Sequence, residues 1–80
     1  MPIVHQEDGF TFKIEASFVG PPYVYVTKGK GFIIIRIGDP QTELPHIDRH
    51  KGVSKDDLDY ADNIVRTYQE KYLSIWERNH

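Results

Sequence analysis

The chain contains no cysteine, so it can form neither a disulfide framework nor a thiolate metal site. It also lacks an apolar run approaching the roughly 20 residues that cross a bilayer, so no contact with a membrane is expected. A nucleophile elbow, a phosphate-binding glycine loop, a catalytic pair of acids and a zinc signature are all missing. These absences favour a protein that needs no cofactor and is not an enzyme.

The chain has no excess of basic residues either. It carries 10 Lys and Arg residues against 12 Asp and Glu residues, which gives a formal net charge of -2 and a pI near 6.0. Proteins that bind nucleic acid phosphates usually carry a net basic domain or a basic stripe, so this charge does not favour a nucleic acid partner. The first residues show no signal-peptide pattern, and a cytoplasmic location is expected.

The length and composition predict one folded domain over residues 1–80. The chain has 80 residues, of which 39% are hydrophobic and 28% charged, as in ordinary soluble globular proteins. A domain of this size buries only about 60–65% of its unfolded surface, so its core is small. No repeat or linker indicates a second domain.

Alternating apolar and polar residues predict a β-strand at about 10–15, and two runs rich in aromatic and β-branched residues predict strands at about 22–28 and 32–37, with a weaker stretch at about 44–50. Gly29 and Gly31 lie between the second and third of these runs, where positive φ angles would suit a short hairpin turn. The simplest arrangement is a small antiparallel meander of three to four strands. Packed against one long C-terminal helix, it gives an α+β fold.

That helix is expected at about residues 55–78. Ser54 and Asp57 have the spacing of a capping box, in which each side chain bonds the other residue's backbone amide. Apolar residues then recur at spacings of three and four, which is typical of an amphipathic helix that packs on one face. They are Leu58, Ala61, Ile64, Val65, Tyr68, Tyr72, Ile75 and Trp76.

The strand at 32–37 is apolar on both faces, and a single helix covers only one of them. Soluble monomers seldom leave a large apolar patch exposed, so the second face is expected to meet another chain. That chain would be a partner protein or a second copy. The alternative is that residues 1–5 or the loop at 38–45 fold over this face.

Several motifs follow one another along nearly the whole chain. Pro21-Pro22 precedes an alternating strand, a glycine-containing turn follows, Gly52-Val53-Ser54-Lys55 begins the helix, and Trp76 lies near its end. This order resembles the bacterial family called domain of unknown function 4160. The resemblance implies a small α+β protein that is the toxin component of a type II toxin–antitoxin pair. The implied partner is a small protein of the family called domain of unknown function 2442.

The chain departs from the family pattern at three positions. In that family the second strand typically reads Pro-Pro-His-x-His-Val, whereas this chain has Tyr23 and Tyr25 at the histidine positions. Tyr68 stands where many members carry Asn or His. A phenol is a poor base at neutral pH and a rare metal ligand, so histidine-dependent chemistry is not expected on this strand. Tyrosine suits cross-strand packing, or contact with a partner or a stacked ring.

Three basic residues near the predicted hairpin, Lys28, Lys30 and Arg36, form a candidate basic cluster. Beside the two strand tyrosines they would hold an RNA backbone while bases stack on the rings. The alternative is that these charges only keep an apolar strand soluble. The predicted binding residues are therefore Tyr23, Tyr25, Lys28, Lys30, Arg36, Tyr68 and Trp76.

His46, Asp48 and His50 alternate along the fourth predicted strand, which would place them on one face. In that geometry they are weak candidates for a metal site, because two imidazoles and a carboxylate are common zinc ligands. Asp48 would equally well orient a histidine by hydrogen bonding, and an edge strand often shows such a polar stripe.

Two classes of function remain. The first, which the sequence favours, is a binding module that docks a partner protein on the tyrosine and isoleucine face and at the helix end near Trp76. The second is an RNA-directed toxin enzyme, in which the basic cluster holds phosphate and His46 or His50 transfers protons.

Overall fold

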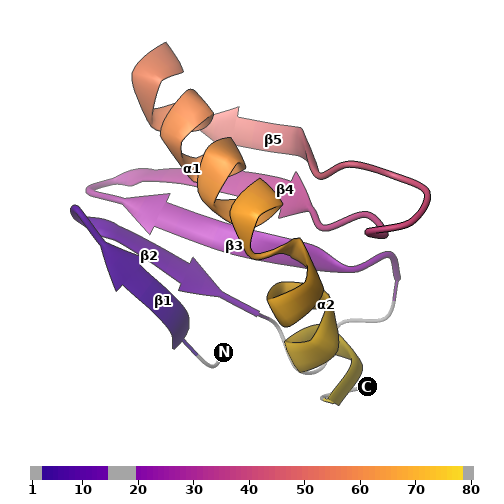
Figure 1. The fold of residues 1–80 in the computed structure, drawn as a ribbon. Coiled ribbons are helices and arrows are strands. Elements are labelled where there is room, and N and C mark those ends of the chain that lie inside the picture. Colours follow the sequence, from indigo (N-terminus) through magenta and orange to yellow (C-terminus); the bar gives the residue numbers. More distant parts are fainter. Residues whose placement is uncertain (1–2, 15–19, 79–80) are drawn as a thin grey trace.

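A computed structural model describes residues 3–14 and 20–78 of the chain. It contains one five-stranded antiparallel sheet, in the order β1-β2-β3-β4-β5, with two helices across one face (Figure 1). The strands are β1 (Ile3–Glu7), β2 (Phe10–Lys13), β3 (Tyr23–Lys28), β4 (Gly31–Arg36) and β5 (His46–Lys51). The helices are α1 (Lys55–Thr67) and α2 (Gln69–Arg78). The predicted α+β class with an antiparallel meander is confirmed.

The sheet has one strand more than the three to four predicted. Edge strand β1 pairs with β2 through a two-residue turn, in which Asp8 has a φ of 50° and Gly9 a φ of 84°. An Asp-Gly pair with positive φ angles is characteristic of tight hairpins, because its twist matches that of the flanking strands. The predicted strand at 10–15 ends at Lys13 in β2, and residue 15 lies outside the described residues.

The core lies between the sheet and the helices. Alternate side chains of the central strands point toward the helices and are almost fully buried, as the period of a strand requires. Each such side chain contributes roughly 1.5–3 kcal/mol of hydrophobic free energy. The buried set is Phe10, Phe12, Ile14, Val24, Val26, Ile33, Ile35 and Ile37, with Ala61, Val65, Tyr72 and Trp76 from the helices.

The helix begins where the sequence predicted. The Asp57 amide donates to Ser54 Oγ at 3.1 Å, and the Ser54 amide donates to Asp57 Oδ2 at 3.2 Å, which completes the capping box. These two bonds satisfy amides that have no partner inside the helix.

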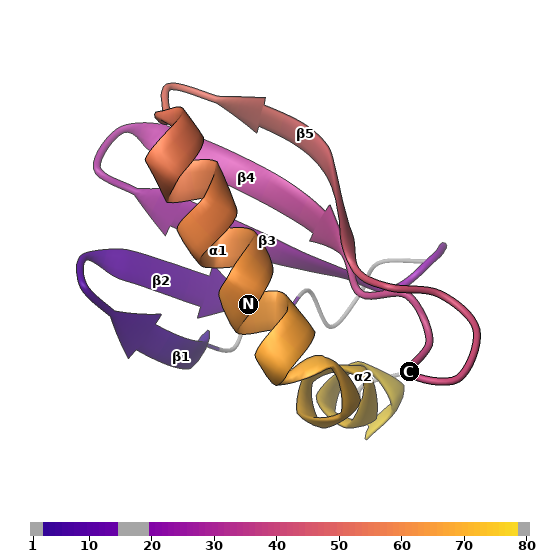
Figure 2. The ribbon, with the colours of Figure 1, turned by 45° about the horizontal axis from the view of Figure 1, so that its top comes forward.

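The prediction of one continuous helix is wrong, because α1 ends at Thr67 and α2 starts at Gln69 in a different direction (Figure 2). The Thr67 hydroxyl donates to the Asn63 carbonyl oxygen at 2.8 Å, a back-bond that often bends helices. Gln69 then takes the buried position that the sequence had assigned to Tyr68. Its Nε2 donates to the carbonyl oxygens of Ile37 at 2.8 Å and Glu43 at 2.7 Å, so α2 is tied to the loop after β4.

The described part of the chain measures 30 × 25 × 20 Å, with a radius of gyration of 11.5 Å. Neither of its helices is long and apolar enough to pass through a bilayer.

Candidate binding surface

The sheet face turned away from the helices, called the open face below, is organised by the strand register. Direct cross-strand partners lie on the same face of a sheet, so the register sets three rows across it. The first row is Tyr23, Arg36 and His46. The second is Ile3, Lys13, Tyr25, Ile34 and Arg49. The third is Gln6, Thr11, Thr27, Phe32 and Lys51.

Neither segment that the sequence offered as a cover lies over the open face. Residues 3–5 belong to β1 and extend the sheet sideways. The loop at 38–45 is bonded to Gln69 and therefore lies against α2. In both views of the described residues, the two helices lie on the same side of the sheet (Figures 1 and 2). The covering alternative is wrong for the part of the chain that the structure describes.

The centre of the open face is apolar and aromatic. Tyr25 on β3 and Phe32 on β4 place their rings 6.0 Å apart, with 18° between the ring planes. Ile34 pairs directly with Tyr25 across the two strands. All three side chains are only half-buried. They form a continuous apolar centre on two adjacent inner strands.

Positive charge surrounds this centre. Lys13 pairs with Tyr25 from the β2 side, while Arg49 and Lys51 pair with Ile34 and Phe32 from the β5 side. Arg49 and Lys51 are exposed, and Lys13 is half-buried. Within residues 3–14 and 20–78, none of these three cations forms an ion pair.

Arg36 belongs to the same face but is held in place. Its Nη2 lies 3.3 Å from Asp48 Oδ2, and its Nη1 donates to the Pro21 carbonyl oxygen at 3.3 Å. Tyr23, Ile34, Arg36, Asp48 and Arg49 line a depression of about 220 Å³ there. Arg36 is thus held by two contacts within the protein, and it is less available to a ligand than Lys13, Arg49 or Lys51.

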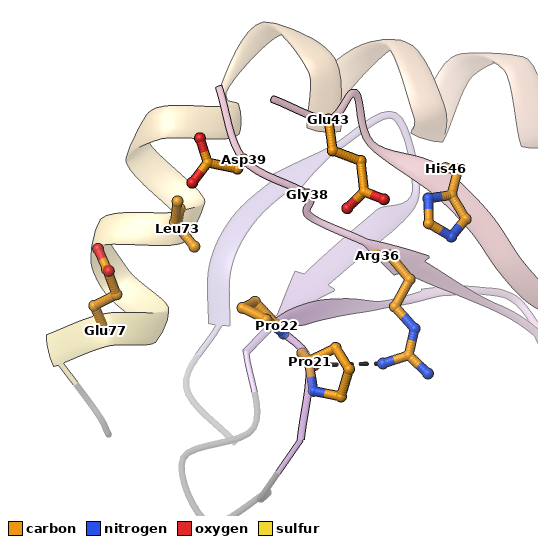
Figure 3. Close-up of a pocket in the computed structure, with 9 residues that line it drawn as sticks. All are labelled: Pro21, Pro22, Arg36, Gly38, Asp39, Glu43, His46, Leu73 and Glu77. Carbon is orange, nitrogen blue, oxygen red and sulfur yellow. Dashed lines mark hydrogen bonds between the residues drawn. The ribbon is translucent and has the colours of Figure 1, made fainter. Parts of the chain in front are cut away.

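A larger cleft of about 580 Å³ begins beside Arg36, at the end of the open face. Figure 3 shows the Arg36 guanidinium directed toward Pro21, with three carboxylates elsewhere around the cleft. Because both signs of charge line it, the cleft has no clear preference for anions or cations. Its lining residues are Pro21, Pro22, Arg36, Gly38, Asp39, Glu43, His46, Leu73 and Glu77.

The predicted cluster of Lys28, Lys30 and Arg36 does not form. Lys28 and Arg36 lie at opposite ends of the β3–β4 hairpin, since Lys28 pairs with Gly31 and Arg36 pairs with Tyr23. Five residues of strand separate the two ends by roughly 17 Å. Lys30 lies in the turn and is exposed. The predicted position of the turn was correct, but Arg36 lies at the end of β4 farthest from that turn.

Lys28 points to the helix side of the sheet, where it has a structural role. Its Nζ lies 2.7 Å from Asp57 Oδ1 and 4.6 Å from the centre of the Phe10 ring. The hydrogen bond from Lys28, followed by the bond from the Ser54 backbone, lowers the pKa of Asp57 below its ordinary 3.8. Lys28 therefore joins β3 to the first turn of α1.

Asp57→Asn is expected to destabilise the protein in a pH-dependent way. Because folding lowers the pKa of Asp57, its carboxylate stabilises the fold fully above pH 3.8, and this contribution is lost as pH falls through the lowered value. The difference in free energy of unfolding between the two proteins should therefore shrink below that pH, as measured by urea denaturation. Asp59→Asn, at an exposed position, is the control. A difference that is constant with pH would contradict the assignment.

The prediction that His46, Asp48 and His50 share one face is wrong. A β-bulge in β5 places both Ile47 and Arg49 opposite consecutive residues of β4, with Asp48 as the extra residue. A bulge interrupts the alternation of side chains, so His46 shares the face of Arg36 and His50 shares the face of Ile33. No three His, Asp or Glu side chains in the described residues lie close enough to hold a metal ion.

The aromatic residues assigned to binding have different positions. Trp76 is only 5% exposed and belongs to the core, and its ring lies 5.6 Å from that of Tyr23, which is partly buried at the end of the sheet and contacts both the open face and the core. Tyr68 is 37% exposed at the helix junction, on the helix side, and its ring lies 5.6 Å from that of His5. Of the aromatic candidates, Tyr23 and Tyr25 belong to the open face.

A tyrosine and two acids also bring β1 and β2 close to α1. The Tyr60 hydroxyl lies against the Glu7 carboxylate and 2.8 Å from Asp8 Oδ2. The bond to Glu7 raises the pKa of Tyr60, followed by burial and the bond to Asp8. Burial likewise raises the pKa of Tyr72. Both phenols therefore stay neutral at physiological pH and offer no base.

Five residues of the open face escaped the sequence-based prediction: Lys13, Phe32, Ile34, Arg49 and Lys51. They lie on three strands, β2, β4 and β5, and only the register brings them together. A scan of known protein families, a search of curated proteins and a search of solved structures each found no match to this chain, so its family resemblance stays a prediction.

Proposed function

We propose that this protein is a cytoplasmic binding module that works through its open face. The observation that carries the proposal is the apolar centre formed by Tyr25, Phe32 and Ile34, which no described segment covers. Aromatic residues in a well-packed patch, with charged groups at its rim, are typical of contact surfaces that bind strongly. The rigid sheet holds these side chains in place before a partner arrives.

The strand edges are less suited to binding than the face. β1 has an irregularity between Ile3 and His5, and β5 has the bulge at Asp48. Bulges and charged side chains at edge strands hinder pairing with another strand, which is how soluble proteins avoid aggregation. This supports docking on the open face over the addition of a strand.

The alternative of an RNA-directed toxin enzyme has less support. It requires phosphate-binding cations next to a histidine that transfers protons. His50 lies on the helix side of β5, while His46 lies at the end of the open face beside the mixed-charge cleft. If the protein were such an enzyme, the geometry would favour His46 over His50 as the residue that transfers protons.

The family resemblance adds a biological setting to this proposal. In a type II toxin–antitoxin pair this chain would be the toxin component, and a small partner of the domain of unknown function 2442 type would dock on it. Self-association through two open faces is less favourable. Lys13, Arg49 and Lys51 would then face their own copies, and like charges repel across an interface.

The test is site-specific photo-crosslinking in the cytoplasm. Phe32 is replaced by benzoylphenylalanine, a photoreactive aromatic residue of similar shape, and the adducts are separated by mass. We expect strong adduct formation, with a protein or with nucleic acid, that disappears when Ile34→Glu is added, because a charge at the apolar centre opposes docking.

The same photoreactive residue at Glu70, an exposed position on α2, serves as the matched control. It should give no comparable adduct. Equal adduct formation from both positions, or none from position 32, would remove the open face as the binding surface.

A further inference from the structure

The distribution of charge identifies the kind of ligand that the open face attracts. Four of the chain's ten Lys and Arg residues lie on this face: Lys13, Arg36, Arg49 and Lys51. Among the described residues, Asp48 is its only acidic side chain. The described part of this face therefore has a formal charge of +3, while the other described residues carry six Lys and Arg against ten Asp and Glu, a sum of -4. The open face is therefore cationic although the chain as a whole has a negative net charge.

Six of the chain's twelve acidic residues, with four of its ten basic residues, lie on the other side of the molecule. Asp56, Asp57, Asp59, Asp62, Glu70 and Glu77 all lie on the two helices. Packed layers of secondary structure are about 10 Å apart, and the Debye length is about 8 Å at physiological ionic strength. Negative charge on the helices is therefore largely screened from a ligand on the open face.

From this arrangement we infer that the open face binds single-stranded nucleic acid, an inference that rests on the proposed function of this face. The rings of Tyr25 and Phe32 lie on two adjacent inner strands, where unpaired bases can stack on them. Lys13 lies on one side of the rings, and Arg49 and Lys51 lie on the other. Phosphates that flank the stacked bases would meet these cations.

The side chains favour this ligand over the two nearest alternatives. A duplex hides its bases from a flat sheet, so it would leave the aromatic centre unused. An acidic protein would also complement the charge. However, lysine is depleted at protein interfaces, and two of the three free cations here are lysines. Thr11 and Thr27, in the third row, add hydroxyl groups able to bond to base edges or phosphates.

The test is fluorescence anisotropy of labelled oligouridylate and oligothymidylate, each about ten nucleotides long, titrated with the full chain. With three free cations, the logarithm of affinity should fall with the logarithm of salt concentration at a slope of about -2. A rise from about 50 to about 200 mM salt should then weaken binding about 20-fold. Tighter binding of one oligonucleotide would show whether RNA or DNA is preferred.

Two triple variants separate the face from the net charge. Lys13→Gln/Arg49→Gln/Lys51→Gln should bring the salt slope near zero. Lys55→Gln/Arg66→Gln/Lys71→Gln removes the same charge from the helices and should leave the slope unchanged. Tyr25→Leu/Phe32→Leu should weaken binding about 10-fold or more, because stacking is lost while apolar side chains remain. Circular dichroism confirms that each variant is folded.

The inference is overturned if neither oligonucleotide binds at about 100 μM protein, the weak limit of non-specific binding. Equal losses in the two triple variants would also overturn it, because net charge alone would then explain the attraction. Binding of a glutamate-rich peptide in place of the oligonucleotides would reassign the ligand to an acidic protein and leave the proposed function intact. The proposed function itself would be contradicted only if the photoreactive residue at position 32 gave no more adduct than the control at position 70.

Discussion

Gly31→Ala is expected to unfold the protein or to destabilise it by at least about 3 kcal/mol. Gly31 is buried at the start of β4, where the chain after β5 crosses close to it. An added methyl group would overlap the Gly52 carbonyl oxygen and would lie 2.7 Å from Val53 Cγ1 and 2.8 Å from the Gly52 carbonyl carbon. Because two of these three atoms belong to the backbone, the overlap cannot be relieved by rotating a side chain.

Gly29→Ala, two residues away, is the matched control. Gly29 has a φ of 58°, but a methyl group there would meet no atom within 4 Å. Its cost is the left-handed backbone alone, about 1–2 kcal/mol, and Gly29→Asn should cost less because asparagine tolerates this conformation. Urea denaturation measures all three variants. Similar losses for Gly31→Ala and Gly29→Ala would contradict the close approach of Gly31 to Gly52.

Trp76→Ala is expected to cost about 3–5 kcal/mol, as truncation of a buried aromatic residue typically does. Trp76 is almost fully buried and packs its ring at 59° against Tyr23, so it fixes the end of α2 to the start of β3. A domain of this length has a total stability of roughly 4–12 kcal/mol. The variant should therefore be largely unfolded at moderate temperature, which a thermal melt followed by circular dichroism will show.

Tyr68→Ala provides the comparison, because it also removes an aromatic ring from the helical region. Tyr68 is partly exposed at the helix junction, so the expected loss is about 1 kcal/mol. If Trp76→Ala proved no more destabilising than Tyr68→Ala, Trp76 would not be part of the core and its assignment as a contact residue would regain support.

The main features of the fold could be predicted because they depend on local patterns. The alternation of tyrosine and valine identified β3, a run of aromatic and β-branched residues identified β4, and the capping box fixed the start of α1 at Ser54. β1 was missed because it is short and half polar, although Asp8-Gly9 was a usable hairpin signal. Thr67 alone did not signal the break in the helix, because a threonine often lies within a continuous helix. The break depends on the two bonds from Gln69 to the loop after β4, and these exist only in the folded chain.

The binding surface was less predictable, because it depends on register and on one bulge. A shift of one residue moves every side chain to the opposite face, so the open-face position of Arg49 could not be assigned without the pairing of β4 and β5. The bulge at Asp48 also reverses the alternation within β5, which separated His46 from His50. Gly31 illustrates the same limit. The sequence offered it as a turn residue, whereas its small size is what the structure requires.

The different charges of the two sides of the sheet change what the net charge implies about nucleic acid binding. A net charge of -2 argued against nucleic acid, but that argument assumed that the charges were mixed over the surface. In the folded chain, Lys13, Arg49 and Lys51 surround an aromatic centre, and the acidic helices lie behind the sheet. The local charge decides what the open face attracts.

The most direct measurement of the central claim is the mapping of backbone amide shifts by nuclear magnetic resonance while oligouridylate is added. If the open face is the binding surface, shifts will concentrate on the central residues of β3, β4 and β5, around Tyr25, Ile34 and Arg49, and α1 will change little. Shifts concentrated on α1 or α2, with the strands unchanged, would contradict the account.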